Sequence, residues 1–248
     1  MSHLRASLPR FVLLAAFATA PLLAAELPNG PVTEAQSELA ALFAQVDALA
    51  QGFSAPEDRA DKEWVKKLLA HLVEVDQAIR KALSNPKLGS WDATARQVFV
   101  DGVTARMADW DAATTAELKG LLAVHRWFTV SEFGKEADKN AWLLVQHADR
   151  DLAFQKQVLE VLSGLYPTGE TNPSNYAYLW DRVAVNSGEL QRYGTQGKCA
   201  EVGRWEPHPV EAPADLEKRR AAVGLQTMAE YKELFKQYGL CQTADPPN

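Results

Sequence analysis

The sequence has no surplus of positive charge, no second long apolar run and none of the common nucleophile or phosphate-binding motifs. Its 26 lysines and arginines are outnumbered by 32 acidic residues, and no basic cluster stands out, so we expect no nucleic-acid partner. After the first 25 residues, no apolar stretch approaches the length of a membrane span. A serine elbow and a lysine-bearing phosphate loop are also missing, which leaves the reaction and the ligand open.

The N-terminus carries the pattern of an export signal. His3, Arg5 and Arg10 precede the apolar run FVLLAAFATAPLLAA, which is too short for a stable membrane span and ends in small residues. Residues 23–25, Leu-Ala-Ala, form an acceptable cleavage site. We therefore predict a signal peptide at 1–25 and an exported protein, periplasmic or secreted. The alternative is that this run forms an N-terminal core helix.

Cysteine is scarce, and the two cysteines, Cys199 and Cys241, are even in number. In an exported chain such a pair favours one disulfide, because oxidation is the usual fate of thiols outside the cytosol. The bond would join a polar loop to the C-terminal helix and contribute roughly 3–4 kcal/mol on the chain-entropy model. Two free thiols are the alternative.

Hydrophobic periodicity is helical through most of the chain, and no segment alternates with a period of two. The pattern predicts helices at 33–52, 55–83, 91–108, 112–127, 137–165, 174–186 and, as a pair interrupted near Gly224, at 213–237. The prolines of residues 198–213 predict an irregular excursion. The predicted fold class is therefore all-α, an irregular multi-helix bundle with a long polar loop near the C-terminus.

The length allows one helical domain with an N-terminal extension after removal of the leader. We predict a signal peptide at 1–25, an N-terminal helical extension at 26–62, a helical domain at 63–240 and a tail at 241–248. No cofactor and, once the signal is cleaved, no membrane span are predicted.

Polar side chains fall inside the apolar arc of the helix predicted through 141–165. His147, Asp151 and Gln155 follow one another at spacings of four residues, on the face that should be dry. Burying such groups without partners costs a few kcal/mol each. We therefore expect another polar row, water, a metal or a ligand to meet them; a histidine satisfied within the core is the alternative.

A second polar row is predicted in the preceding long helix. Asp76 and Arg80 lie four residues apart within its apolar arc. A structural ion pair within one helix would explain them, but two embedded rows with both signs of charge favour a shared pocket. Asp181 and Arg182, adjacent on the short helix predicted at 174–186, are further candidates.

The stretch LQRYGTQGKC, residues 190–199, interrupts this helical composition with amides, glycines and hydroxyls. Gln191 and Gln196 each offer a donor and an acceptor, Tyr193 offers a flat face with a polar tip, and Thr195 offers a hydroxyl. This set suits a polyol, an amide or a peptide better than a phosphate, because no basic cluster accompanies it. The alternative is a tight loop whose amides cap helix ends and satisfy the buried rows.

Four sequence blocks also carry a resemblance to a known family. LVEVDQAIRKAL, AWLLVQHADRDLAFQKQVLEVL, YAYLWDRVAVNSGELQRYGTQ and EKRRAAVGLQTMAEY, spread over residues 66–238, resemble the bacterial family catalogued as domain of unknown function 6624. The positions that match its pattern are Asp76, Gln77, Arg80, Gln146, His147, Asp149, Gln155, Asp181, Arg182, Gln191, Tyr193, Gly194, Thr195 and Gln196. The chain departs from the pattern at VHRWF and at HPVEAP. The resemblance implies a shared site and no particular activity.

Three functional hypotheses follow from these patterns. In the first, the protein is a general acid-base enzyme acting on a small polar, glycan or peptide ligand. His147 then exchanges protons, Asp151 or Asp181 orients it, and Arg80 or Arg182 binds an anionic group. Asp76, Gln155 and the loop residues Gln191, Tyr193, Thr195 and Gln196 would complete the ligand site.

A metal variant of this hypothesis would use His147, Asp151 and a third ligand such as Asp181, but those spacings are far less diagnostic than a HExxH helix. In the second hypothesis, the same pocket belongs to a non-catalytic ligand-binding or protein-interaction module of the cell envelope. In the third, the polar rows pair with one another and fix how the helices pack.

Overall fold

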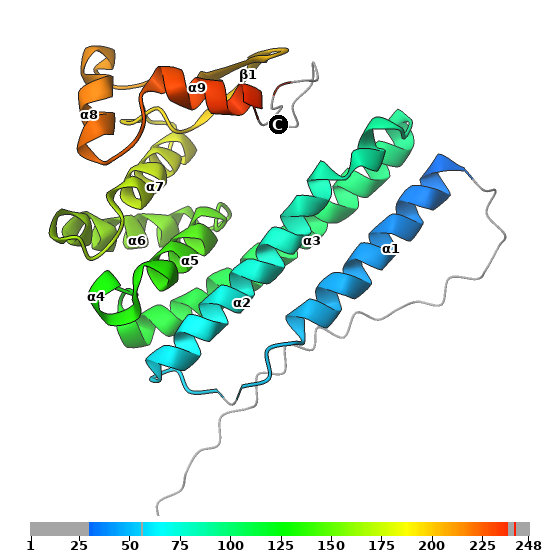
Figure 1. Ribbon diagram of the computed structural model, residues 1–248, viewed down its shortest axis with the longest axis horizontal. Coiled ribbons are helices and arrows are strands. Elements are labelled where there is room, and N and C mark those ends of the chain that lie inside the picture. Colours follow the sequence, from blue (N-terminus) through cyan, green and yellow to red (C-terminus); the bar gives the residue numbers. More distant parts are fainter. Residues whose placement is uncertain (1–29, 56, 238–240, 242–248) are drawn as a thin grey trace, which may run out of the picture.

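Helices make up most of the computed structural model, which describes residues 30–55, 57–237 and Cys241 (Figure 1). The elements are α1 (Pro31–Ala50), α2 (Lys62–Lys81), α3 (Ala93–His125), α4 (Val130–Phe133), α5 (Lys135–Gln146), α6 (Leu152–Leu165), α7 (Pro173–Asn186), β1 (Gly197–Glu201), β2 (Arg204–Pro207), α8 (Leu216–Ala222) and α9 (Met228–Gln237). Short 3₁₀ turns lie at Ala82–Ser84, Pro86–Gly89, Tyr166–Thr168 and Pro213–Asp215. The predicted all-α class is confirmed, and the strands of the described chain form one two-stranded hairpin.

Two sequence predictions fall outside the described residues. They are the signal peptide, residues 1–25, and residues 242–248 of the predicted tail. Within the described ranges, no helix combines the length and the apolar character needed to cross a bilayer.

The three long helices α1, α2 and α3 lie side by side and enclose their own core (Figure 1). Its buried members are Ala35, Val46, Val75, Ile79, Trp91, Ala95, Phe99 and Val103. Helix α1 lies close to α3 at Gly102, where an added Cβ would lie 2.2 Å from Cδ2 of Leu39. A side chain at this position would therefore have to displace the end of the Leu39 side chain.

Helix α3 runs unbroken for 33 residues, so the break predicted between 108 and 112 is wrong. At this point of α3, the polar groups of Trp110 and Asp111 face α2. Nε1 of Trp110 donates to the carbonyl of Leu72 at 3.3 Å, and Asp111 pairs with Arg80 on α2. Since α2 satisfies these groups, α3 can continue through them.

Helix α5 packs against α2 and α3, α4 packs against α2 and α5, and α6 and α7 pack against α5 and each other. Together they surround the larger core, which includes Trp127, Phe128, Leu144 and Leu179. The single helix predicted at 137–165 is wrong, because α5 ends at Gln146 and α6 begins at Leu152. The carboxylate of Asp151 caps α6 by accepting the backbone N–H of Phe154 at 3.0 Å. No glycine or proline marks this break in the sequence.

The C-terminal part follows the predictions in its helices and departs from them in its loop. Helix α7 and the pair α8 and α9, separated around Gly224, are confirmed. Residues 198–213 were predicted as irregular, but most of their first half belongs to the antiparallel hairpin β1–β2, which spans 197–207. The predicted disulfide is present, with the Cα atoms of Cys199 and Cys241 5.3 Å apart, and it joins β1 to the chain beyond α9.

Candidate functional site

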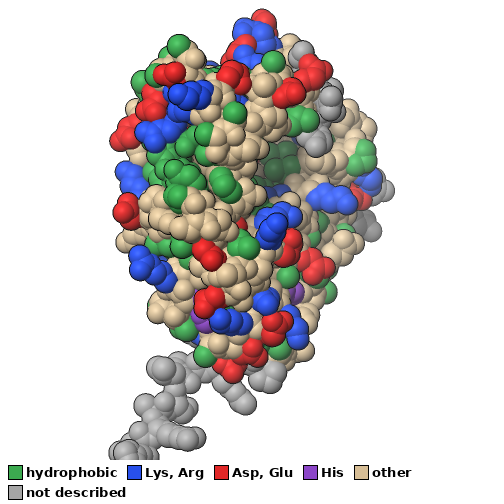
Figure 2. Space-filling view, turned by 60° about the vertical axis from the view of Figure 1, so that its left-hand side comes forward, with side chains coloured by type: hydrophobic (Ala, Val, Ile, Leu, Met, Phe, Trp, Pro, Cys, Tyr) green, Lys and Arg blue, Asp and Glu red, His purple; other side chains and the backbone are tan. Residues whose placement is uncertain are grey.

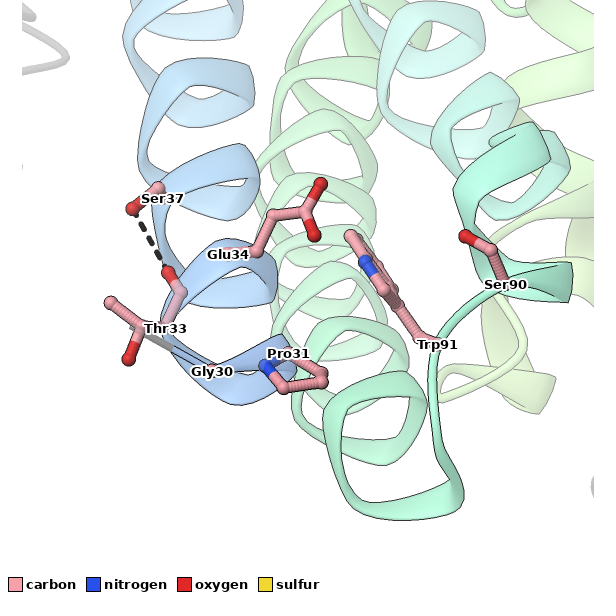
Figure 3. Close-up of a pocket in the computed structure, with 7 residues that line it drawn as sticks. All are labelled: Gly30, Pro31, Thr33, Glu34, Ser37, Ser90 and Trp91. Carbon is pink, nitrogen blue, oxygen red and sulfur yellow. Dashed lines mark hydrogen bonds between the residues drawn. The ribbon is translucent and has the colours of Figure 1, made fainter. Parts of the chain in front are cut away.

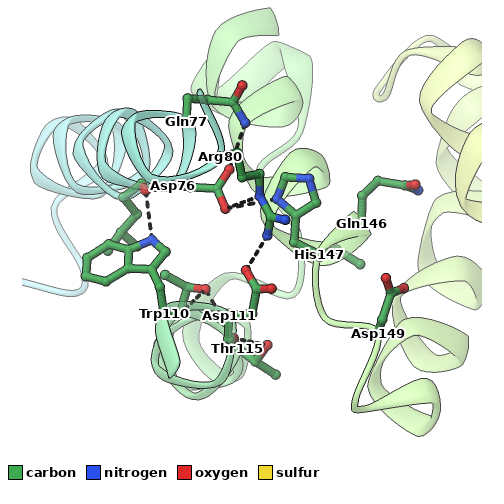
Figure 4. A network of polar contacts seen from close by, with 12 residues as sticks. Asp76, Gln77, Arg80, Trp110, Asp111, Thr115, Gln146, His147 and Asp149 are labelled. Carbon is green, nitrogen blue, oxygen red and sulfur yellow. Dashed lines mark hydrogen bonds and ion pairs between the residues drawn. The ribbon is translucent and has the colours of Figure 1, made fainter. Parts of the chain in front are cut away.

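Side chains from both predicted polar rows meet where α2 lies beside the five-residue link 147–151 between α5 and α6 (Figure 4). Nδ1 of His147 lies 3.0 Å from Oδ1 of Asp76. Nε of Arg80 donates to the same oxygen at 2.9 Å, and the amide of Gln77 donates to Oδ2 at 2.7 Å. Asp76 is buried, with 1% of its surface exposed. The structure thus brings together His147, Asp76 and Arg80.

A second carboxylate, Asp111 on α3, completes the cluster. Nη2 of Arg80 donates to Oδ1 of Asp111 at 2.5 Å. One oxygen from each aspartate and one ring nitrogen of His147 all lie within 4.8 Å of one another. Arg80 therefore links two carboxylates beside the imidazole. We call Asp76, Arg80, Asp111 and His147 the acid-base cluster.

The two carboxylates of the acid-base cluster have opposite pKa shifts. Burial by itself raises the pKa of Asp76, but the hydrogen bond and charge of His147, the charge of Arg80 and the amide of Gln77 outweigh burial and bring it below the ordinary value. For Asp111, burial outweighs the attraction of Arg80 and raises the pKa. Such a divergence between neighbouring carboxyl groups is typical of sites that divide acid and base roles between them.

His147 keeps one ring nitrogen open. Because Asp76 is ionised and accepts hydrogen bonds, Nδ1 of His147 must carry the proton in their contact, and the lone pair of the neutral ring then lies on Nε2. No residue of the described chain hydrogen-bonds Nε2. The side chain is 16% exposed, so solvent or a small molecule can reach it.

The link that carries His147 is braced from the opposite side. Nε of Arg182 donates to Oε1 of Gln146 at 2.9 Å, and its Nη1 donates to Asp149 at 2.7 Å. The buried amide of Gln155 donates to the carbonyl of Val145 at 3.1 Å and to the carboxylate of Asp149 at 3.1 Å. In Figure 4 the side chain of Gln146 points away from Asp76 and Arg80, whereas the imidazole of His147 points toward them. Arg182 and Gln155 thus hold the link in place.

The predicted row of His147, Asp151 and Gln155 does not lie on one helix, because the chain leaves helical geometry between the first two. Asp151 is the N-cap of α6, and its second contact is an ion pair with Lys119 of α3. Gln155 points toward the end of α5. Asp76, and not Asp151, is the carboxylate that contacts His147.

The remaining candidates hold the loop after α7. Asp181, fully buried, accepts the backbone N–H groups of Arg192, Tyr193 and Thr195 at 2.7–2.9 Å and the Thr195 hydroxyl at 2.9 Å. Gln191 donates to the carbonyls of Gln196 and His208 and accepts the N–H of Gln196. Burial raises the pKa of Asp181 more than its four donors lower it. The polar groups of Asp181, Gln191 and Thr195 therefore form hydrogen bonds that stabilise the loop itself.

A metal ion fits the acid-base cluster poorly. Among the described residues, the group of potential metal ligands is Asp76, Asp111 and His147, and it includes neither Asp151 nor Asp181. Arg80 already donates to an oxygen of each aspartate. A cation between these residues would have to displace a guanidinium that is tied on both sides.

The surface hollows in the described part of the chain include two beside α1. One, of about 560 Å³, is lined by Gly30, Pro31, Thr33, Glu34, Ser37, Ser90 and Trp91 (Figure 3). The other, of about 380 Å³, is lined by Leu42, Gln45, Val46, Leu49, Ala78, Lys81 and Ala82. No predicted site residue lines either of them. On the face in Figure 2, acidic and basic side chains are intermingled around a further hollow with hydrophobic side chains at its base.

The sequence did not single out Asp111, although a signal for it exists. On a continuous helix, Asp111 shares one face with Thr114, Thr115 and Leu118, which are all buried. The helix break predicted at 108–112 concealed this pattern.

Residues 63–242 match the model of DUF6624, a family of unknown function. The chain belongs to this family. The match begins near the start of α2 and includes every residue of the acid-base cluster and of the loop after α7. No curated protein and no solved structure matches the chain. Family membership therefore adds a shared architecture to the site and no activity.

Proposed function

We propose that this protein is an exported general acid-base enzyme in which His147 exchanges a proton with a small polar, glycan or peptide ligand. The observation that carries the proposal is the 3.0 Å contact between Asp76 and Nδ1 of His147, which leaves Nε2 without a partner in the described chain. A base held by a carboxylate on one nitrogen and open on the other is the usual arrangement for proton transfer by histidine.

The proton transfer itself needs only groups of the acid-base cluster. Nε2 takes a proton from a hydroxyl or water of the reacting complex, and the imidazolium that forms is stabilised by ionised Asp76. The same proton then passes from Nε2 to the leaving group, so the imidazole returns to its neutral form. Hydrolysis, elimination and group transfer all fit this sequence.

Arg80 supports the same chemistry. Its Nε and Nη2 are bonded to the two aspartates, while Nη1 has no hydrogen-bond partner in the described chain. A guanidinium fixed in this way, on the same Asp76 oxygen as His147, keeps one donor that can stabilise negative charge on a ligand oxygen. Export is supported by the leader pattern and by the Cys199–Cys241 disulfide, which is a weaker indication.

The structural hypothesis competes with this proposal, because Asp76 and Arg80 neutralise each other within the cluster. It explains the ion pairs, but it does not require a histidine with one open nitrogen. A non-catalytic binding module would need the opening and no proton transfer.

The test compares His147→Gln with the wild-type protein. Both are incubated with muropeptides, chito-oligosaccharides and short peptides, and products are detected by mass spectrometry. We expect turnover of at least one probe by the wild type and a loss of about 100-fold or more in His147→Gln, since general acid-base groups contribute roughly 10²–10⁴-fold. His208→Gln is the control, because no described residue hydrogen-bonds the His208 imidazole.

Two outcomes would contradict the proposal. If the wild type converts none of the probes but binds one, and His147→Gln abolishes that binding, the protein is a binding module. If His147→Gln instead lowers the free energy of unfolding by several kcal/mol and no probe is bound or converted, the acid-base cluster is structural.

A further inference from the structure

Tyr166, Tyr176 and Tyr193 lie close together on the side of α7 that faces away from Arg182, and Trp180 and Arg192 lie beside them. The rings of Tyr166 and Tyr176 stack with centroids 4.3 Å apart. Tyr176 and Trp180 are four residues apart on α7 and so share one face of the helix. Tyr193 packs edge-on against Trp180 at 6.3 Å, and the guanidinium of Arg192 lies 4.4 Å from the Trp180 ring. We call these five residues the tyrosine cluster.

The tyrosine hydroxyls have no protein partner, although the rings are buried. Tyr176 and Tyr193 are only 7% and 6% exposed. Within the described chain no residue hydrogen-bonds the hydroxyl of Tyr166, Tyr176 or Tyr193, and none of these oxygens is closed off from solvent. Burial raises the pKa of Tyr193 to about 12, so its hydroxyl stays protonated and can donate as well as accept.

The open hydroxyl of Tyr193 is held in a rigid position. Asp181 binds the backbone N–H groups of both Arg192 and Tyr193. The carbonyl of Arg192 accepts from Arg219 at 2.8 Å, and that of Tyr193 accepts from fully buried Arg220 at 2.5 Å. A loop fixed at both backbone groups that leaves a side-chain hydroxyl free is preorganised for a ligand.

The charges around the tyrosine cluster do not favour binding of an anionic ligand. Arg192 is paired with Glu211 at 2.7 Å, and Glu160 of α6 adds a negative charge near Tyr176. An anionic ligand would gain no net attraction there, and one face of Trp180 is already taken by a guanidinium. A ligand with several hydroxyls next to apolar C–H groups fits three phenol tips and buried aromatic rings.

We propose that the tyrosine cluster is a binding site for a neutral saccharide. Tyr166, Tyr176 and Tyr193 exchange hydrogen bonds with sugar hydroxyls through their open tips, and the buried rings exclude water around the sugar. The site is separate from the acid-base cluster. Trp180 lies two residues before Arg182, and residues two apart point about 160° apart around a helix. The inference therefore does not depend on proton transfer by His147.

The test is a titration of the full-length protein with maltotriose and N-acetylchitotriose. Binding is followed by tryptophan fluorescence and by the shift in melting temperature. The double variant Tyr176→Phe/Tyr193→Phe keeps both rings and removes both hydroxyls. We expect at least one saccharide to bind the wild type and to bind the variant about 10- to 100-fold more weakly, since each lost hydrogen bond is worth roughly 0.5–1.5 kcal/mol.

Tyr178→Phe serves as the matched control. It also removes a phenol from α7, but Tyr178 packs against Trp142 and Tyr231 and not against the tyrosine cluster. It should bind saccharide like the wild type. The proposal is overturned if neither saccharide binds, if the double variant binds as tightly as the wild type, or if benzoate or tetramethylammonium binds at this site in their place. If His147→Gln loses acid-base turnover but binds saccharide like the wild type, the saccharide-site proposal is supported independently of the proposed enzyme activity.

Discussion

At Asp76, a buried carboxylate accepts hydrogen bonds from Gln77, Arg80 and His147, and this links the stability of the fold to pH. Its folded-state pKa is lowered, so the unfolded chain takes up this proton at a higher pH than the folded chain does. The stabilisation is therefore present above the ordinary aspartate pKa of about 4 and is lost as the pH falls through the lowered value.

Asp76→Asn should lower the free energy of unfolding at pH 7 by roughly 1–3 kcal/mol, because it removes the charge that Gln77, Arg80 and His147 bind, while Arg80 keeps its ion pair with Asp111. It should also flatten the fall in stability below about pH 4. Urea unfolding of both proteins at several pH values between 3 and 7 measures these effects. Asp109→Asn, on the exposed side of α3, is the control. Equal slopes for Asp76→Asn and the wild type in acid would contradict the prediction.

The candidate site was only partly predictable at this scale. Asp76 and Arg80 could be found because each is a polar residue inside the apolar arc of α2, and His147 was found because the sequence pattern of α5 extends one residue past its end. Asp111 could not be found once its helix was divided. For Gln191 and Thr195, composition revealed the polar groups but not their direction, since an amide that binds a ligand and one that satisfies its own loop look alike in sequence.

At the scale of secondary-structure elements, two contacts attach the hairpin β1–β2 to the C-terminal part of the chain. The disulfide ties Cys199 to Cys241, and the ring of Trp205 stacks on Phe235 of α9 at 4.2 Å. With the two cysteines 42 positions apart in the sequence, the chain-entropy model assigns the bond roughly 4 kcal/mol of stability.

Cys199→Ser/Cys241→Ser should therefore lower the free energy of unfolding by up to about 4 kcal/mol. Thermal unfolding followed by circular dichroism, with and without a reductant, measures the difference. The reductant should destabilise the wild type and leave the double variant unchanged. A wild type that is insensitive to reduction would show that the bond contributes little.

The helices were more predictable than the connections between them. Periodicity located α1, α2 and α7 because each keeps one apolar face along its length, but the predicted start of α2 at residue 55 is wrong, since the helix begins at Lys62 after its N-cap Asp61. It missed the end of α5, where Gln146 is followed by HADRD, because this break is made by a side-chain cap and not by glycine or proline. Asp151 followed by helix-forming residues was the one local signal. The hairpin at 197–207 was missed because its strands pair across a short turn and lack clear alternation.

For the whole molecule, the packing of α1 against α3 tests how firmly the N-terminal helix belongs to the fold. Gly102→Val should lower the free energy of unfolding by roughly 1–3 kcal/mol, since the added side chain must displace the end of Leu39 and overpacks the contact. Urea unfolding measures the change.

Gly164→Ala provides the control for this prediction. A Cβ at Gly164 meets no atom within 4 Å, and alanine favours a helix over glycine by about 1 kcal/mol, so this variant should be slightly more stable. If Gly102→Val is as stable as the wild type, α1 can move away from α3 at little cost.

The link 147–151 touches four helices through side chains. His147 reaches α2, Asp149 reaches α6 and α7, and Asp151 reaches α3. These contacts constrain the number of residues in the link more strictly than in a loop whose side chains face solvent. Inserting or deleting a single amino acid would shift the side chains of the link relative to one another and separate several of these partners at once. Natural variation in loop length should accordingly accumulate at other turns, and peptide insertions made by protein engineers should be tolerated poorly here.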